Sequence, residues 1–153
     1  MTDRARGAAV LRAALLRAEI DAVLADWAYH LDRGELDPLA ELFTEDALFV
    51  TGAADYRGRS AIKGRYAERT SVRTTRHVYS GLRVRAVDEG TVRAWSTWVN
   101  YAANAPAPVD EVGVYLVADF DDVLTWCADA RWRISSRRII PVFRDPRRAP
   151  ITG

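Results

Sequence analysis

The sequence is poor in the residues that most often bind metals or form cross-links. Its 153 residues include one cysteine, Cys127, and two histidines, His30 and His77. A single cysteine excludes an internal disulfide, and so few sulfur and imidazole groups cannot complete a closed structural zinc site. We therefore expect no metal, and we expect a reducing, cytoplasmic setting.

Net charge and long apolar runs are lacking as well. The 22 basic and 21 acidic residues nearly cancel, so no broad field attracts nucleic acid or an anionic membrane. Arg or Asp interrupts every apolar run well before the roughly 20 residues that a transmembrane helix needs. Arg12 and Arg17 also break the apolar N-terminal stretch, which favours an amphipathic helix over a signal peptide. We expect neither nucleic acid nor membrane as a partner.

Cofactor motifs are missing too. The sequence has no glycine-rich phosphate loop, no dinucleotide fingerprint and no nucleophile elbow. His30 and Asp32 imitate the spacing of an iron site, but residues two apart on a helix point about 200° from each other. We therefore expect no cofactor, and the candidate chemistry is acid–base catalysis by side chains.

The first half of the chain is predicted to be helical and the second half to form strands. Periodicity predicts a first helix over residues 9–33, with Trp27 on its apolar stripe and Gly34 as its stop signal. Asp37 and Ser60 are expected to cap two shorter helices. These two shorter helices are predicted at 38–46 and 61–70. Strands are predicted at 47–52, 74–88, 91–102, 111–127 and 131–143.

Helices followed by an antiparallel meander predict an α+β fold. The length suits one domain over residues 1–153, with a core at about 9–143 and an irregular C-terminal tail at 144–153.

His77 is the natural acid–base candidate, because imidazole titrates near neutral pH. Asp32 lies in the last turn of the first predicted helix, where the helix dipole disfavours a negative charge, so it suits another task such as orienting a histidine. Strict strand alternation places His77 on the wet face, but a bulge at Ser80 and Gly81 returns it to the core side. From the residues alone, catalytic and structural roles stay equally open.

The hairpin after His77 predicts its neighbours. The stretch DEGT suggests a two-residue turn, which places Tyr79 opposite Asn100 and His77 opposite Ala102. Trp98 and Asn100 then share a face with His77 and Tyr79, forming an aromatic wall for a small, mostly apolar ligand. For each tryptophan, packing in the core is the alternative interpretation.

Four segments in order carry a family resemblance: WAYHLDRGELDPLAELFTEDALF, GRSAIKGRYAERT, TTRHVYSGLRV and ARWRISSRRIIP. Together they resemble the SnoaL-like branch of the nuclear transport factor 2-like superfamily over about residues 18–143. The resemblance implies a cone-shaped fold, in which N-terminal helices pack on a curved antiparallel sheet that encloses a pocket. It also implies a homodimer or a homotrimer.

Enzymes of this branch, such as scytalone dehydratase, use an Asp–His dyad. The resemblance therefore implies that His77 removes a proton and that Asp32 orients the imidazole of His77. Trp27 stands where a tyrosine is usual, and Asn100 stands where the next strand carries an acid. These two departures favour isomerisation or cyclisation over plain dehydration.

The resulting expectation is a cofactor-free lyase or isomerase acting on a small, mostly apolar metabolite. The resemblance allows two alternatives, a non-catalytic β subunit of a ring-hydroxylating dioxygenase and a small-ligand-binding protein. The expected catalytic pair is His77 and Asp32. The residues expected to bind substrate are Trp27, Tyr29, Tyr79, Trp98 and Asn100.

Overall fold

The computed structural model describes residues 3–69 and 72–151, and these residues form an α+β fold. The helices are α1 (Asp3–Arg33), α2 (Leu36–Glu41), α3 (Arg59–Ala67) and a short 3-10 turn, η1 (Pro146–Arg148). The strands are β1 (Phe43–Val50), β2 (Asp55–Arg57), β3 (Thr74–Ala86), β4 (Thr91–Ala103), β5 (Val114–Trp126) and β6 (Trp132–Arg144).

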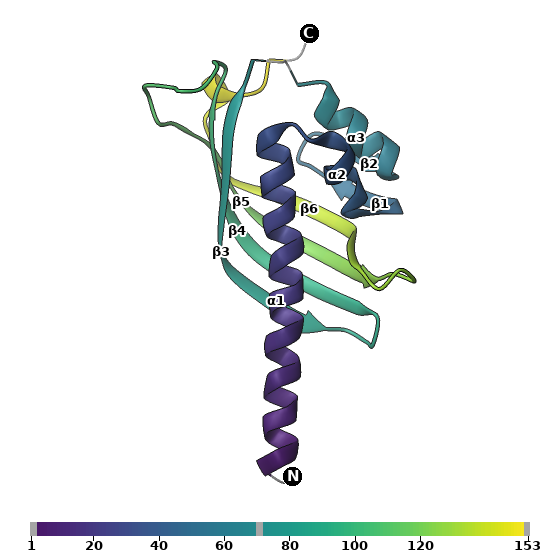
Figure 1. Cartoon of the computed structure of the whole chain (residues 1–153). Coiled ribbons are helices and arrows are strands. Elements are labelled where there is room, and N and C mark those ends of the chain that lie inside the picture. Colours follow the sequence, from purple (N-terminus) through teal and green to yellow (C-terminus); the bar gives the residue numbers. More distant parts are fainter. Residues whose placement is uncertain (1–2, 70–71, 152–153) are drawn as a thin grey trace.

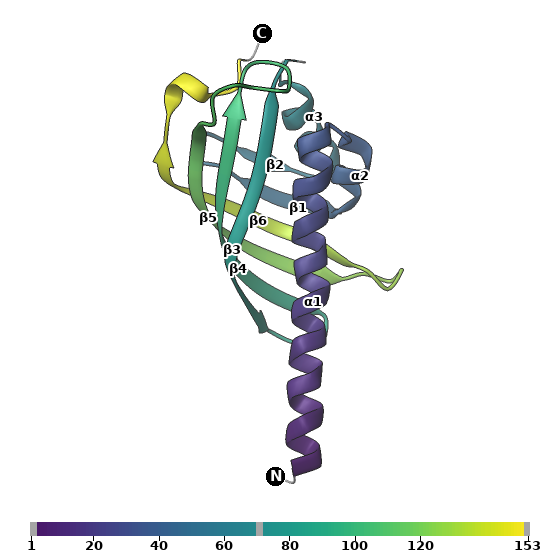
Figure 2. The same ribbon diagram turned by 60° about the vertical axis from the view of Figure 1, so that its left-hand side comes forward.

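The described strands form one sheet in the order β2-β1-β6-β5-β4-β3. Neighbouring strands run antiparallel except β1 and β6, which run parallel. Strands β3 to β6 therefore form the predicted meander. Figures 1 and 2 show a curved sheet with α1 lying across its inner side and with α2 and α3 grouped beside β1.

Helix α1 packs on the sheet through its second half. It starts at Asp3, earlier than predicted, and its first turns extend past the sheet and are exposed (Figure 1). Gly34 follows the helix with a φ of 71°, the left-handed conformation of a glycine stop. In the described ranges, no helix is both long and apolar enough to cross a membrane. The buried residues of α1 recur at helical spacing: Ile20, Leu24, Trp27, Ala28 and Leu31.

The segment after α1 differs from the predicted helix over 38–46. Helix α2 begins at Leu36 and ends at Glu41, and Asp37 is inside it rather than at its cap. Pro38 is tolerated there because the first backbone N–H groups of a helix need no helical partner. The rest of the segment pairs with β6 as β1, which buries Phe43 and Phe49. Pairing with a strand distant in sequence overrides the local helical pattern here.

Helix α3 also starts earlier than predicted. Gly58 is its N-cap, no side chain caps it, and Ser60 lies inside the first turn. The expected Ser60 cap is therefore wrong. The buried residues of α3 are Ile62 and Tyr66, four positions apart, so Tyr66 points inward.

The hairpin between β3 and β4 is offset by two residues from the predicted register. Its loop spans residues 88–90, which is one residue longer than predicted. A bulge at Gly81 adds a further residue to β3 but not to β4. The two offsets add, so His77 lies opposite Asn100 rather than opposite Ala102.

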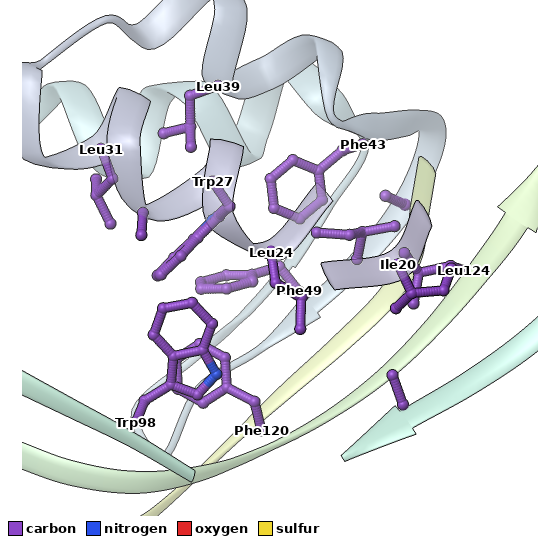
Figure 3. Close-up of a cluster of buried hydrophobic side chains, with 14 of the residues drawn as sticks. Ile20, Leu24, Trp27, Leu31, Leu39, Phe43, Phe49, Trp98, Phe120 and Leu124 are labelled. Atoms are coloured by element: carbon purple, nitrogen blue, oxygen red, sulfur yellow. The ribbon is translucent and has the colours of Figure 1, made fainter. Parts of the chain in front are cut away.

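The core between α1 and the sheet contains a buried ion pair. Arg137 and Asp122 both have 0% exposed side chains, and they form two hydrogen bonds of 2.7 and 2.8 Å. The Arg137 guanidinium lies 4.4 Å from the Trp27 ring centre, 4.9 Å from that of Phe120 and 5.9 Å from that of Trp98. Figure 3 shows these three aromatic side chains together at the centre of the core. The ion pair therefore supports the aromatic cluster.

Substitution of Asp122 by asparagine is expected to lower the free energy of unfolding by about 3 kcal/mol, because Arg137 then stays buried without a counter-charge. Urea denaturation measures this change. The matched control is Asp121→Asn. Asp121 pairs with Arg93, whose side chain is 42% exposed, so loss of this ion pair is expected to change the free energy of unfolding little. An Asp122→Asn protein as stable as the wild type contradicts this prediction.

Candidate active site

A glycine bulge in β3 turns His77 toward the core. Gly81 has a φ of 65°, and the register shifts between Ser80 and Arg83. Before the bulge, His77 points inward with a 5% exposed side chain, and after it the buried residue is Leu82. The inward positions thus change from odd to even numbers. The predicted bulge is present, and it removes the conflict in strand alternation.

The Asp32 carboxylate accepts three hydrogen bonds at the end of α1. Its Oδ1 accepts from His77 Nδ1 at 2.6 Å and from Thr75 Oγ1 at 2.7 Å, while its Oδ2 accepts from the His77 backbone N–H at 2.8 Å. The Asp32 side chain is 6% exposed. These contacts fix the imidazole ring and assign the proton on Nδ1, which leaves Nε2 as the unprotonated nitrogen.

Burial and charge set the protonation of this pair. Burial lowers the pKa of His77 below its ordinary value, and the charges of Arg69 and Arg73 add to this, although Asp32 opposes them. Burial by itself raises the pKa of Asp32, but the hydrogen bonds and charge from His77 and the bond from Thr75 together lower it below its ordinary value. At neutral pH the pair is therefore a carboxylate and a neutral imidazole, which is the form that accepts a proton.

The imidazole of His77 is expected to titrate below pH 6.5, the ordinary histidine value. Between the lowered pKa and about 6.5 the unfolded chain binds a proton that the folded chain rejects, so stability falls as the pH falls through this window. NMR titration of a His30→Gln variant, in which His77 is the only histidine, measures this pKa directly. A midpoint above 6.5 contradicts the prediction.

His77 lines a cavity of about 380 Å³ between α1, α3 and the inner face of the sheet. Three of the five residues expected to bind substrate, Trp27, Trp98 and Asn100, line the same cavity. The rings of Trp98 and Phe120 are stacked with their centres 5.0 Å apart, and the Trp27 ring contacts both of them edge-on. The floor of the cavity is therefore aromatic and suits a flat, apolar molecule.

The other two residues expected in the site lie outside this cavity. Tyr29 follows Trp27 by two helical positions, so it points about 200° away and is 50% exposed. Tyr79 stacks on Trp98 at 4.5 Å, and its hydroxyl donates to Asp21 at 2.9 Å. Tyr79 therefore supports a wall of the site through Trp98. Neither tyrosine lines this cavity, and their contact with a substrate stays a prediction.

Tyr66 and Arg69 line the cavity but were missed by reasoning from the sequence. Tyr66 is in the last turn of α3, and Arg69 follows the end of this helix by two residues. A signal was available, since Ile62 and Tyr66 are the large apolar positions of that helix at a spacing of four. The tyrosine on a buried face carries a hydroxyl into the core.

Several polar atoms of the lining residues are buried without a hydrogen-bond partner in the described structure: Trp27 Nε1, Tyr66 Oη, Arg69 Nε and Asn100 Oδ1. Burial raises the pKa of Tyr66, so its hydroxyl stays protonated. The charges of Arg69 and Arg137 oppose this rise. These atoms are available to a ligand.

A second cavity of about 290 Å³ lies on the other side of the dyad. Asp32, Thr75 and Arg73 line it, and it shares Tyr66 and Arg69 with the larger cavity. The carboxylate thus lies beside one cavity and the imidazole beside the other. His77 alone of the pair faces the aromatic floor.

Among the described residues, no group of three or more His, Cys, Asp or Glu side chains is placed to hold a metal ion. His30 pairs with Glu35 at 2.6 Å and takes no part in the cavity. His30 and Asp32 therefore point in different directions, as expected: His30 pairs with Glu35, whereas Asp32 pairs with His77.

The helices on a curved, unclosed sheet define a fold of the nuclear transport factor 2-like type. A family model described as a SnoaL-like domain matches residues 12–138, which is most of the chain. The chain belongs to the SnoaL-like family. No curated protein gives a significant match.

Solved structures share this fold. A protein from Catenulispora acidiphila, solved in complex with S-DNPA, is 27% identical with a TM-score of 0.72, and the match covers 84% of this chain and 94% of that one. A proposed scytalone dehydratase from Novosphingobium aromaticivorans is 20% identical, with a TM-score of 0.74 and coverage of 91% and 92%. A nuclear transport factor 2-like protein with a cystatin-like fold from the same species is 23% identical, with a TM-score of 0.73 and coverage of 97% and 96%.

Proposed function

We propose that this protein is a cofactor-free lyase or isomerase that removes a proton from an acidic C–H group of a small, mostly apolar metabolite. The observation that carries the proposal is the neutral imidazole of His77, held by the buried Asp32 carboxylate beside an aromatic cavity. Such a histidine matches the geometry and protonation of a general base.

In the proposed reaction, His77 Nε2 takes the proton from a carbon next to a carbonyl group. The C–H electron pair moves into the carbonyl and forms an enolate, while the imidazolium is stabilised by Asp32. The enolate then expels hydroxide from the next carbon, takes a proton at another carbon, or attacks a second carbonyl to form an alkoxide. The His77 imidazolium returns its proton to the departing hydroxide, to that carbon or to the alkoxide, which regenerates the base. These outcomes correspond to dehydration, isomerisation and cyclisation.

The acid in this scheme comes from α3 rather than from the positions usual in related enzymes. Trp27 and Asn100 occupy those positions and carry no acidic group. The Tyr66 hydroxyl and the Trp27 N–H line the cavity as buried donors, and neither has an acceptor in the part of the chain that the structure describes. In this proposal they stabilise the enolate oxygen, because a donor kept out of water stabilises developing charge strongly.

The Tyr66→Phe variant is expected to lower turnover about 10²-fold, the typical loss for one donor to an oxyanion. The same variant removes only the hydroxyl oxygen, which has no hydrogen-bond partner among the described residues, so its melting temperature is expected to stay close to that of the wild type. Steady-state kinetics and thermal melting are the two measurements. Unchanged turnover in Tyr66→Phe contradicts the role of its hydroxyl.

The relatives support the proposal at a coarse level. The Catenulispora protein was solved with a bound compound, S-DNPA. One of the two Novosphingobium proteins, the one that is 20% identical, carries the name of a scytalone dehydratase. These names describe those proteins. For this chain they support a small-molecule ligand and chemistry of the lyase or isomerase type.

Proton exchange in D₂O tests the proposal without knowledge of the final product. A panel of aromatic and polycyclic ketones is incubated with the protein, and NMR follows the loss of the acidic C–H signal. Exchange with the wild type and none above buffer with His77→Gln supports the proposal. No exchange of any panel member by the wild type, or equal exchange by both proteins, contradicts it.

A further inference from the structure

The charged groups around the larger cavity are all of one sign. Three arginines line it, Arg65, Arg69 and Arg144, and among the described lining residues there is no Asp or Glu. Within the described ranges none of the three has an ion-pair partner, although arginines elsewhere in the chain do. Among the described residues, the lining of this cavity therefore has positive charge without a counter-charge.

Arg69 is the innermost of these arginines. Burial lowers its pKa, and its guanidinium lies 4.8 Å from the Tyr66 ring centre. Its Nε is buried without an acceptor among the described residues. A guanidinium keeps its charge in a protein, so its burial is unfavourable until an anion accepts its N–H groups. Arg65 and the exposed Arg144 continue the positive lining of the same cavity.

Side chains in contact connect Arg69 to the dyad. The Tyr66 and Trp27 rings contact each other edge-on with their centres 6.4 Å apart. The Trp27 and His77 rings do the same with their centres 5.3 Å apart. Arg69 and His77 line the same cavity, and the charge of Arg69 lowers the pKa of His77. A molecule on the aromatic floor can therefore reach Arg69 with one end and His77 with the other.

We infer that the substrate is an aromatic or polycyclic acid, whose carboxylate or equally acidic oxygen is bound by Arg69 while its apolar rings lie on Trp27, Trp98 and Phe120. This inference rests on the proposed function for the role of His77, but the binding of an anion at Arg69 stands by itself. A planar guanidinium suits such an oxyanion, because it donates two parallel hydrogen bonds.

Binding of an anion has a consequence for the base. A carboxylate at Arg69 neutralises the positive charge that lowers the pKa of His77. His77 then becomes a stronger base when the substrate is bound, while it stays neutral in the free protein. The substrate thus assists its own deprotonation.

The test compares 2-naphthoate with 2-naphthamide, two flat probes that differ in charge and little in shape. Isothermal titration calorimetry is expected to show naphthoate binding at least about tenfold more tightly than naphthamide to the wild type. Arg69→Met is expected to abolish this preference, and Arg69→Lys to retain part of it. The matched control is Arg57→Met, which removes one charge from an exposed position outside the cavity.

Equal binding of the two probes, or no naphthoate binding at millimolar concentration, overturns the inference. So does an equal loss of preference in Arg57→Met and Arg69→Met, because net charge then explains it. If Arg69→Met does not fold, Arg65→Met and Arg69→Lys provide the comparison, and a preference unaffected by both overturns the inference.

A further readout separates this inference from the proposed function. Naphthoate, but not naphthamide, is expected to raise the pKa of His77 in NMR titrations. His77→Gln is expected to bind naphthoate as the wild type does. Preserved naphthoate binding with no proton exchange by the wild type contradicts the proposed function alone, whereas proton exchange without a preference for naphthoate contradicts this inference alone.

Discussion

Replacing His77 by alanine is expected to reduce turnover by about 10⁴-fold, the upper range for loss of a general base. His77 is the one described histidine that lines the cavity, and no Asp or Glu lines it among the described residues. No other described group there is placed to take a proton at neutral pH. Binding of an apolar ligand is expected to change less than about threefold, since Trp27, Trp98 and Phe120 keep their positions.

The matched control for this variant is His30→Ala. His30 is the other histidine of the chain and pairs with Glu35 outside the cavity, so its loss is expected to leave turnover at the wild-type level. Both variants are measured by steady-state kinetics on the substrate that proton exchange identifies, with melting temperature as the check on folding. Wild-type turnover in a folded His77→Ala protein removes His77 as the base.

That outcome decides between two interpretations of the same geometry. In an assembly subunit or a binding protein, Asp32 and His77 only join the end of α1 to β3, and their loss lowers stability without affecting any reaction. In an enzyme, the loss falls mainly on the transition state and therefore on turnover. The ratio of the effect on turnover to the effect on stability is thus the informative quantity.

The pairing of Asp32 with His77 was expected from the family resemblance, and two local signals in the sequence agree with it. Asp32 lies next to a helix end that Gly34 fixes, and Gly81 marks the bulge that turns His77 inward. Both glycines have positive φ, a conformation that other residues adopt rarely. Such backbone signals are readable without knowledge of the partners in space.

The register of the β3–β4 hairpin shows where local reasoning fails. A bulge was expected, but its extra residue was not carried into the pairing, and the loop at 88–90 is one residue longer than the sequence suggested. Each offset is a single residue, and together they move Asn100 to the position opposite His77. Side-chain alternation is unchanged by a shift of two, so Asn100 still faces the cavity.

The remaining site residues depend on contacts between distant segments. Tyr66 and Arg69 reach the cavity because α3 packs against α2 and β1, which brings the end of this helix and the residues after it to the inner side of the sheet (Figure 1). β1 was partly assigned to a helix because its partner β6 lies about 90 residues further along the chain. Tyr29 was expected in the site from its distance to Asp32 along the helix, whereas its direction decides its exposure.

The hydrogen bonds of Asp32 explain why an amide cannot replace it. Three donors, the Thr75 hydroxyl, the His77 backbone N–H and His77 Nδ1–H, meet the two carboxylate oxygens. An asparagine presents one oxygen and one NH₂ group, so one of these donors faces an NH₂ or the imidazole changes tautomer. In the second tautomer the proton is on Nε2, and His77 no longer accepts a proton from a ligand in the cavity.

Asp32→Asn is therefore expected to fold and to bind ligand, but to turn over about 10³-fold more slowly, because the amide favours the wrong tautomer and leaves the imidazolium without a counter-charge. One buried donor without a partner costs about 1–3 kcal/mol of stability, which denaturation measures beside the kinetics. Thr75→Val is the matched control: it removes a donor to the same carboxylate but leaves the tautomer of His77 unchanged, so turnover is expected to fall less than about tenfold. If Asp32→Asn and Thr75→Val slow the reaction equally, Asp32 acts through packing at the end of α1 and not through the imidazole.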